Sequence, residues 1–124
     1  MKKNEVREQR YAFALRIVQL AQWLREQKQF ELAAQILRAG TSIGANVEEA
    51  LAGISRADFI AKMSIASKEA RESHYWLRIL RDSKLVPAKD IEPLLAECES
   101  LLRILTAIVK TSQSSADSKS KINN

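Results

Sequence analysis

Five side chains between residues 68 and 81 have the types and spacing of a phosphate-contacting surface. They are Lys68, Arg71, Tyr75, Arg78 and Arg81. In a helix, at about 100° per residue, Arg71 and Arg78 nearly eclipse and the other three lie on the same side. Basic side chains pair with backbone phosphates, and a tyrosine ring offers a surface on which a base can stack. The pattern therefore fits a nucleic-acid-binding face. The alternative is an ordinary solvated face, partly neutralised by Glu72 and Asp82.

The residues that enzymes use for proton transfer, nucleophilic attack or metal binding are scarce. The chain has one histidine, His74, and one cysteine, Cys98. A di-iron centre in a helix bundle needs two Glu-x-x-His pairs, and the residue three before His74 is Arg71. Cys98 lies on an apolar stripe, where a thiol packs as a small core residue. We expect no enzymatic activity, no metal and no cofactor, with His74 at the surface or at an interface.

Composition fits one domain with an acidic partner. The 124 residues are 46% hydrophobic and carry a net charge of +5, and a basic excess suits nucleic acid. A single cysteine excludes an internal disulfide and fits a reducing cytoplasm. The basic N-terminus lacks the apolar stretch of a secretory signal, and no run approaches the length of a membrane span. We expect a cytoplasmic protein.

Four segments have the three- and four-residue apolar spacing of amphipathic helices. They cover about residues 5–27, 29–52, 55–82 and 90–110. Asp90 is the expected N-cap of the last helix, which places Pro93 in the first turn, where a missing N–H costs little. Short links between long helices predict an all-α, antiparallel up-down four-helix bundle over residues 1–110. The polar residues 111–124 predict a disordered tail.

All three glycines lie between Gly40 and Gly53. Gly40 and Gly44 share the apolar face of the second helix, which predicts a seam where another helix approaches closely. A kink or break near Gly40 is the alternative. Gly53 is expected to end the helix in a left-handed backbone conformation. Ser55 and Asp58 then form a capping-box-like pair at the start of the third helix.

Glu69 lies near the middle of the apolar arc of the third helix, so its carboxylate needs a partner. The candidate partners in the second helix are Arg38, Ser42 and Asn46. The sequence favours a structural polar network over catalysis. The alternative places Glu69 at a subunit interface or in a wet groove.

Glu48 and Glu49 put negative charge at the C-terminal end of the second helix, which is unfavourable for the helix dipole. Such residues are expected to be paired. The candidate partners are Arg56, Lys62 or a residue of a neighbouring subunit.

Two blocks together resemble the four-helix-bundle protein family, also called the 23S rRNA intervening-sequence protein family. They are TSIGANVEEA, residues 41–50, and SRADFIAKMSIASKEARESHYWLRIL, residues 55–80. The likeness covers about residues 5–110, including the Leu-rich last helix. Its pattern S-I-G-A-N-x-x-E falls on Ser42, Gly44, Asn46 and Glu49, and it continues with S-x-x-D-F at Ser55 and Asp58.

The resemblance implies a small bacterial, cytosolic four-helix bundle that assembles into a ring-shaped homopentamer. Some genes of the family lie within insertions in large-subunit ribosomal RNA genes, so the family name records a gene location. A related branch accompanies a reverse transcriptase and binds nucleic acid through a basic surface. The resemblance thus implies self-association and RNA, DNA or a nucleic-acid enzyme as further partners. A protein–protein assembly module with no nucleic-acid role is the alternative.

Overall fold

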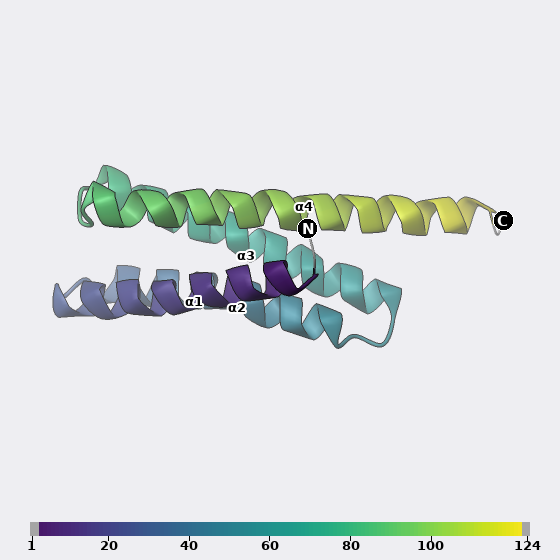
Figure 1. Cartoon of the computed structure of the whole chain (residues 1–124), viewed down its shortest axis with the longest axis horizontal. Coiled ribbons are helices and arrows are strands. Elements are labelled where there is room, and N and C mark those ends of the chain that lie inside the picture. Colours follow the sequence, from purple (N-terminus) through teal and green to yellow (C-terminus); the bar gives the residue numbers. More distant parts are fainter. Residues whose placement is uncertain (1–2, 123–124) are drawn as a thin grey trace.

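Four long antiparallel helices make up the fold (Figure 1). The computed structural model describes the backbone of residues 3–122 and the side chains of residues 8–115. The helices are α1 (Lys3–Glu26), α2 (Phe30–Leu51), α3 (Arg56–Asp82) and α4 (Ala88–Ile122). The all-α four-helix prediction is confirmed. Within the described residues, none of these helices combines the length and apolar character that crossing a membrane requires.

An apolar stripe on each of the four helices forms the core; on α1 it runs through Phe13 and Ile17, whereas Tyr11 and Leu15 are exposed. Its largest fully buried side chains come from all four helices: Phe13, Ile17, Leu24, Ile36, Ile43, Leu77, Leu80, Ile91, Leu101 and Leu105. α2 packs against both α1 and α3, and α3 also packs against α4, whereas α1 and α4 share a much smaller interface. The bundle is therefore most open along the α1–α4 seam.

The α1–α2 turn is closed by a lysine in a left-handed conformation. Lys28 has φ 62°, and the N–H of Gln29 donates to the Leu24 carbonyl at 2.8 Å, while the Lys28 N–H donates to the Arg25 carbonyl at 2.9 Å. These two bonds form a Schellman motif, which glycine usually ends. The sequence gives no sign of a left-handed residue here.

α2 passes through Gly40 and Gly44 without a break, so the kink alternative is wrong. A Cβ at Gly40 would lie 2.7 Å from Cγ2 and 2.9 Å from Cγ1 of Ile17 in α1. The predicted close-packing seam therefore exists at this position. A Cβ at Gly44 would lie 3.7 Å from Cγ of Arg10, an ordinary contact. Of the two glycines, only Gly40 is required by space.

The prediction that Gly53 adopts a left-handed backbone is wrong, because no glycine among the described residues has positive φ. Ala52 caps α2 in a right-handed conformation, and the Gly53 N–H donates to the Ala50 carbonyl at 3.2 Å. A Cβ at Gly53 would lie 2.4 Å from Oδ2 of Asp58. The glycine makes room for the first turn of α3 rather than for an unusual dihedral angle.

The expected N-cap at Asp90 is also wrong, because α4 begins at Ala88 and Pro93 lies inside the helix. The Pro87 carbonyl accepts hydrogen bonds from the N–H groups of Asp90 at 2.9 Å and Ile91 at 3.1 Å. These two bonds begin the first turn of α4. The earlier start places Val86 and Ile91 in the core, 4% and 0% exposed. Their burial offsets the hydrogen bond that Pro93 cannot donate.

The segment 111–124, predicted as a disordered tail, needs a correction over most of its length. α4 continues as helix to Ile122 and projects past the ends of the other helices (Figure 1); residues 123–124 lie outside the described part. The chain has no glycine or proline after Pro93. A helix already nucleated by its packed half extends at little cost through such a sequence.

Candidate nucleic-acid interface

The outer surface of α3 presents the predicted basic stripe to solvent. Lys68, Arg71 and Arg78 are exposed, and Tyr75 is 51% exposed. The Arg78 guanidinium lies 6.0 Å from the centroid of the Tyr75 ring, at the outer limit of a cation–π contact. Tyr75 also meets Trp76 edge to face, with ring centroids 5.3 Å apart. The structure thus places an aromatic ring among the cations of the stripe.

The cations of the stripe differ in whether they already form an ion pair with a carboxylate. Arg81 Nε donates to Oδ1 of Asp82 at 2.8 Å. This hydrogen bond raises the pKa of Arg81 and lowers the pKa of Asp82. Lys68, Arg71 and Arg78 make no ion pair within the described part of the chain. These three, rather than Arg81, have charge available for an external anion.

Two side-chain pairs set the register between α3 and α4. They are Ser67 with Thr106 and His74 with Glu99, each at 3.1 Å. Midway between these two pairs, Arg71 of α3 lies at the same height as residues 102–103 of α4. Arg103 is exposed. Arg103 therefore extends the basic face onto α4. No pattern in the sequence indicates this position of Arg103, because only the pairing of α3 with α4 reveals it.

The polar network expected around Glu69 exists and involves Arg38. Arg38 Nη1 lies 3.2 Å from Oε2 of Glu69, whose side chain is 15% exposed, and the same guanidinium binds Glu72. Trp76 Nε1 donates to Glu72 at 3.2 Å. The other two candidate partners bond locally instead: Asn46 Nδ2 donates to the Ser42 carbonyl at 2.9 Å and to its hydroxyl at 3.2 Å. This network ties α2 to α3 beneath the basic stripe.

The two carboxylates at the end of α2 are paired as expected. Lys62 Nζ, one of the candidate partners, lies 3.1 Å from Oε2 of Glu49. Glu48 binds Arg10 of α1, whose side chain is only 3% exposed. The Arg10 stem packs against Gly44, and no pattern in the sequence of α1 indicates that this arginine is buried.

The start of α3 follows the predicted cap. The Asp58 N–H donates to Oγ of Ser55 at 3.0 Å, and Ser55 is extended, as an N-cap should be. Among the described residues, only this half of the capping box forms. It fixes the beginning of the helix that carries the stripe.

The two side chains with the most chemical reactivity, Cys98 and His74, are both packed against other residues. Burial raises the pKa of the Cys98 thiol to about 12, with a smaller effect from Glu99, and its Sγ lies 3.3 Å from the Ala70 carbonyl. His74 is half-buried against Glu99. Within the described residues, no three His, Cys, Asp or Glu side chains are placed to hold a metal ion.

Comparison with known proteins points to one family. Residues 2–107 match the family model described as 23S rRNA-intervening sequence protein. The chain is also similar to a crystal structure from Bacteroides thetaiotaomicron, a protein with unknown function from the S23 ribosomal protein family. The two are 43% identical, the match covers 85% of this chain and 98% of that one, and the TM-score is 0.81. Among curated proteins, none matches this chain.

Proposed function

The chain belongs to the 23S rRNA-intervening sequence protein family, and we propose that it is a non-enzymatic, homo-oligomeric protein that binds nucleic acid through the outer face of α3. Lys68, Arg71 and Arg78 contact backbone phosphates in this proposal, and Tyr75 stacks on a base of a single-stranded segment. The role is that of a cytoplasmic accessory protein, acting beside a nucleic-acid enzyme such as a reverse transcriptase. RNA and DNA are both candidate ligands.

One observation carries the proposal: three exposed cations that make no ion pair with any described residue lie on one helix face, around an exposed aromatic ring. Lys68 and Arg78 are ten residues apart, or about 15 Å along the helix at 1.5 Å per residue. A strand of B-form DNA carries one phosphate per about 3.4 Å of axis. The face is therefore long enough to follow about four nucleotides.

Self-association is supported by large apolar side chains left in solvent on α1 and α2. Tyr11 is 67% exposed, Leu15 49% and Phe30 59%. Tyr11 and Leu15 are four residues apart and share one face of α1, and contiguous exposed apolar side chains are typical of protein interfaces. A homopentamer is the assembly that the family resemblance implies, and we propose it for this chain.

The location of the interface is tested by fluorescence anisotropy with labelled RNA and DNA oligonucleotides at about 50 mM salt, where phosphate contacts are strongest. The variant Arg71→Gln/Arg78→Gln should bind at least tenfold more weakly than the unsubstituted protein. Arg25→Gln/Arg56→Gln removes the same charge from exposed positions outside the stripe and should bind nearly as well. Equal losses in both double variants would contradict a localised interface.

The alternative, an assembly module without a nucleic-acid role, predicts a different result for the same variant. If Arg71 and Arg78 contact an acidic surface of a neighbouring subunit, Arg71→Gln/Arg78→Gln should lower the mass measured by light scattering. Binding of nucleic acid would be absent before and after the substitution. An unchanged mass together with weaker nucleic-acid binding supports the proposal instead.

A further inference from the structure

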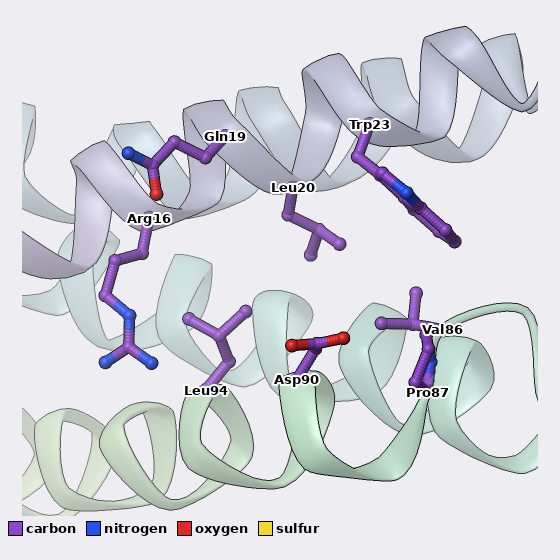
Figure 2. A pocket seen from close by; sticks show the side chains of 8 residues that line it. All are labelled: Arg16, Gln19, Leu20, Trp23, Val86, Pro87, Asp90 and Leu94. Atoms are coloured by element: carbon purple, nitrogen blue, oxygen red, sulfur yellow. The ribbon is translucent and has the colours of Figure 1, made fainter.

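A cavity of about 340 Å³ opens between α1 and α4, near the α3–α4 connection (Figure 2). It lies on the sparsely packed α1–α4 seam, away from the outer face of α3. Its lining residues are Arg16, Gln19, Leu20, Trp23, Val86, Pro87, Asp90 and Leu94. The volume falls within the range of about 300–1,000 Å³ that small-molecule sites occupy.

Most of the cavity wall is apolar. In Figure 2 the flat Trp23 ring extends from α1 toward Val86 and Pro87, while Leu20 and Leu94 point toward each other across the seam. Leu20 and Leu94 are 8% and 5% exposed, so they form the floor. Trp23 is only partly buried, and its indole face is the most favourable aromatic surface for a cation.

Two charged side chains line the cavity, Arg16 and Asp90. Arg16 crosses the seam and binds Glu97 of α4, so its charge is already matched. Asp90 points from the first turn of α4 toward α1 (Figure 2) and makes no side-chain hydrogen bond or ion pair within the described part of the chain. Beside Arg16, Oε2 of Glu97 is buried and accepts no hydrogen bond from the described residues. Of the two charged side chains that line the cavity, Asp90 is therefore the one without an ion-pair partner among the described residues.

We propose that this cavity binds a primary organic ammonium ion with an apolar body, such as an aralkyl amine. The ammonium group donates charge-assisted hydrogen bonds to the Asp90 carboxylate, which are stronger than neutral ones. The apolar body packs between Trp23 and the Val86–Pro87 wall. A carboxylate ligand is disfavoured, because Arg16 is occupied by Glu97 and the remaining charge would repel it.

The test compares three ligands with the same apolar body: 2-phenylethylammonium, 2-phenylethanol and 3-phenylpropanoate. Trp76→Phe leaves Trp23 as the only tryptophan, since the chain has two, so fluorescence reports on the cavity alone. The amine should give a saturable change and bind at least tenfold more tightly than the alcohol or the acid. Equal affinities for amine and alcohol, or no saturable change up to about 50 mM amine, would overturn the proposal.

Two variants in the Trp76→Phe background assign the ammonium contact. Asp90→Asn should abolish the preference for amine over alcohol, a loss of about tenfold or more. Glu92→Gln removes the same charge two residues along α4, from an exposed side chain that does not line the cavity, and should keep the preference. A preference that survives Asp90→Asn, or that Glu92→Gln abolishes as well, would contradict the assigned contact. The comparison of the three ligands uses the Trp76→Phe protein with Asp90 in place, so it tests the proposal even if Asp90→Asn or Glu92→Gln does not fold.

Discussion

The seam between α1 and α2 predicts opposite effects for the same substitution at two glycines of one helix. An added Cβ at Gly40 would lie 2.7, 2.9 and 3.2 Å from Cγ2, Cγ1 and Cβ of Ile17. Carbon atoms in good contact are about 3.5–4.0 Å apart. Ile17 is fully buried and β-branched, so its side chain has little freedom to move away. At Gly44 the nearest atom would be 3.7 Å away, in the flexible stem of Arg10.

Two free-energy terms decide the sign of each effect. Replacing a helical glycine by alanine stabilises a helix by about 1 kcal/mol, and overpacking a core costs about 1–3 kcal/mol. Both terms apply to Gly40→Ala, and because the overpacking cost exceeds the helix gain, this variant should be less stable by about 1 kcal/mol. Only the first term applies to Gly44→Ala, which should stabilise the protein by up to about 1 kcal/mol. The two variants should therefore differ by about 2 kcal/mol.

Urea unfolding followed by circular dichroism measures both values, at one protomer concentration because association shifts apparent stability. Equal m-values would show that the variants expose equal surface on unfolding. Ile17→Ala provides a control for the contact: it should cost about 2–5 kcal/mol alone, and less than the sum of the single effects when combined with Gly40→Ala. A Gly40→Ala variant as stable as Gly44→Ala would refute the seam.

Three other predictions test local features of the fold. Lys28→Gly should raise the free energy of unfolding by about 1 kcal/mol, because a left-handed non-glycine residue costs about that much; an unchanged urea midpoint would contradict the observed turn. Ser55→Ala should lower the free energy of unfolding by about 1 kcal/mol through loss of the N-cap, whereas a loss below about 0.3 kcal/mol would mean that the Ser55 hydroxyl does not hold α3. Cys98 should react with a disulfide reagent at pH 8 only after unfolding, since burial raises its pKa to about 12, and rapid labelling of the folded protein would disprove its burial. The unfolded thiol titrates near 9.0, so stability should also fall as pH rises above that value, because the unfolded chain then loses a proton that the folded chain keeps.

Apolar periodicity predicted the fold well because four core-facing stripes follow the helical repeat throughout the chain. It failed at helix ends, where backbone geometry decides the outcome. Lys28 and Lys84 adopt positive φ and Gly53 does not, although glycine is the residue that sequence reasoning expects in that conformation. Asp90 resembles an N-cap in sequence, but burial of Val86 and Ile91 moves the start of α4 to Ala88.

Charge pairing across helices was predictable only in part. The link between Glu69 and Arg38 follows from one buried carboxylate facing a helix with a single basic residue. Arg10 is buried on α1, where its stem packs against Gly44 and its guanidinium binds Glu48 of α2, and no pattern within α1 alone indicates this. For the same reason the place of Arg103 beside Arg71 depends on helix register, which the sequence leaves undetermined.

The central claim is that α3 binds phosphates through its unpaired cations, and the salt dependence of binding tests it most directly. A plot of log K against log salt concentration has a slope of about −0.9 per phosphate contact in duplex DNA and about −0.7 in a single strand. Contacts from Lys68, Arg71 and Arg78 predict a slope of about −2 to −3 per protomer, reduced by nearly two-thirds in Arg71→Gln/Arg78→Gln. Absence of binding at about 50 mM salt, or an affinity that does not change with salt, would contradict the claim.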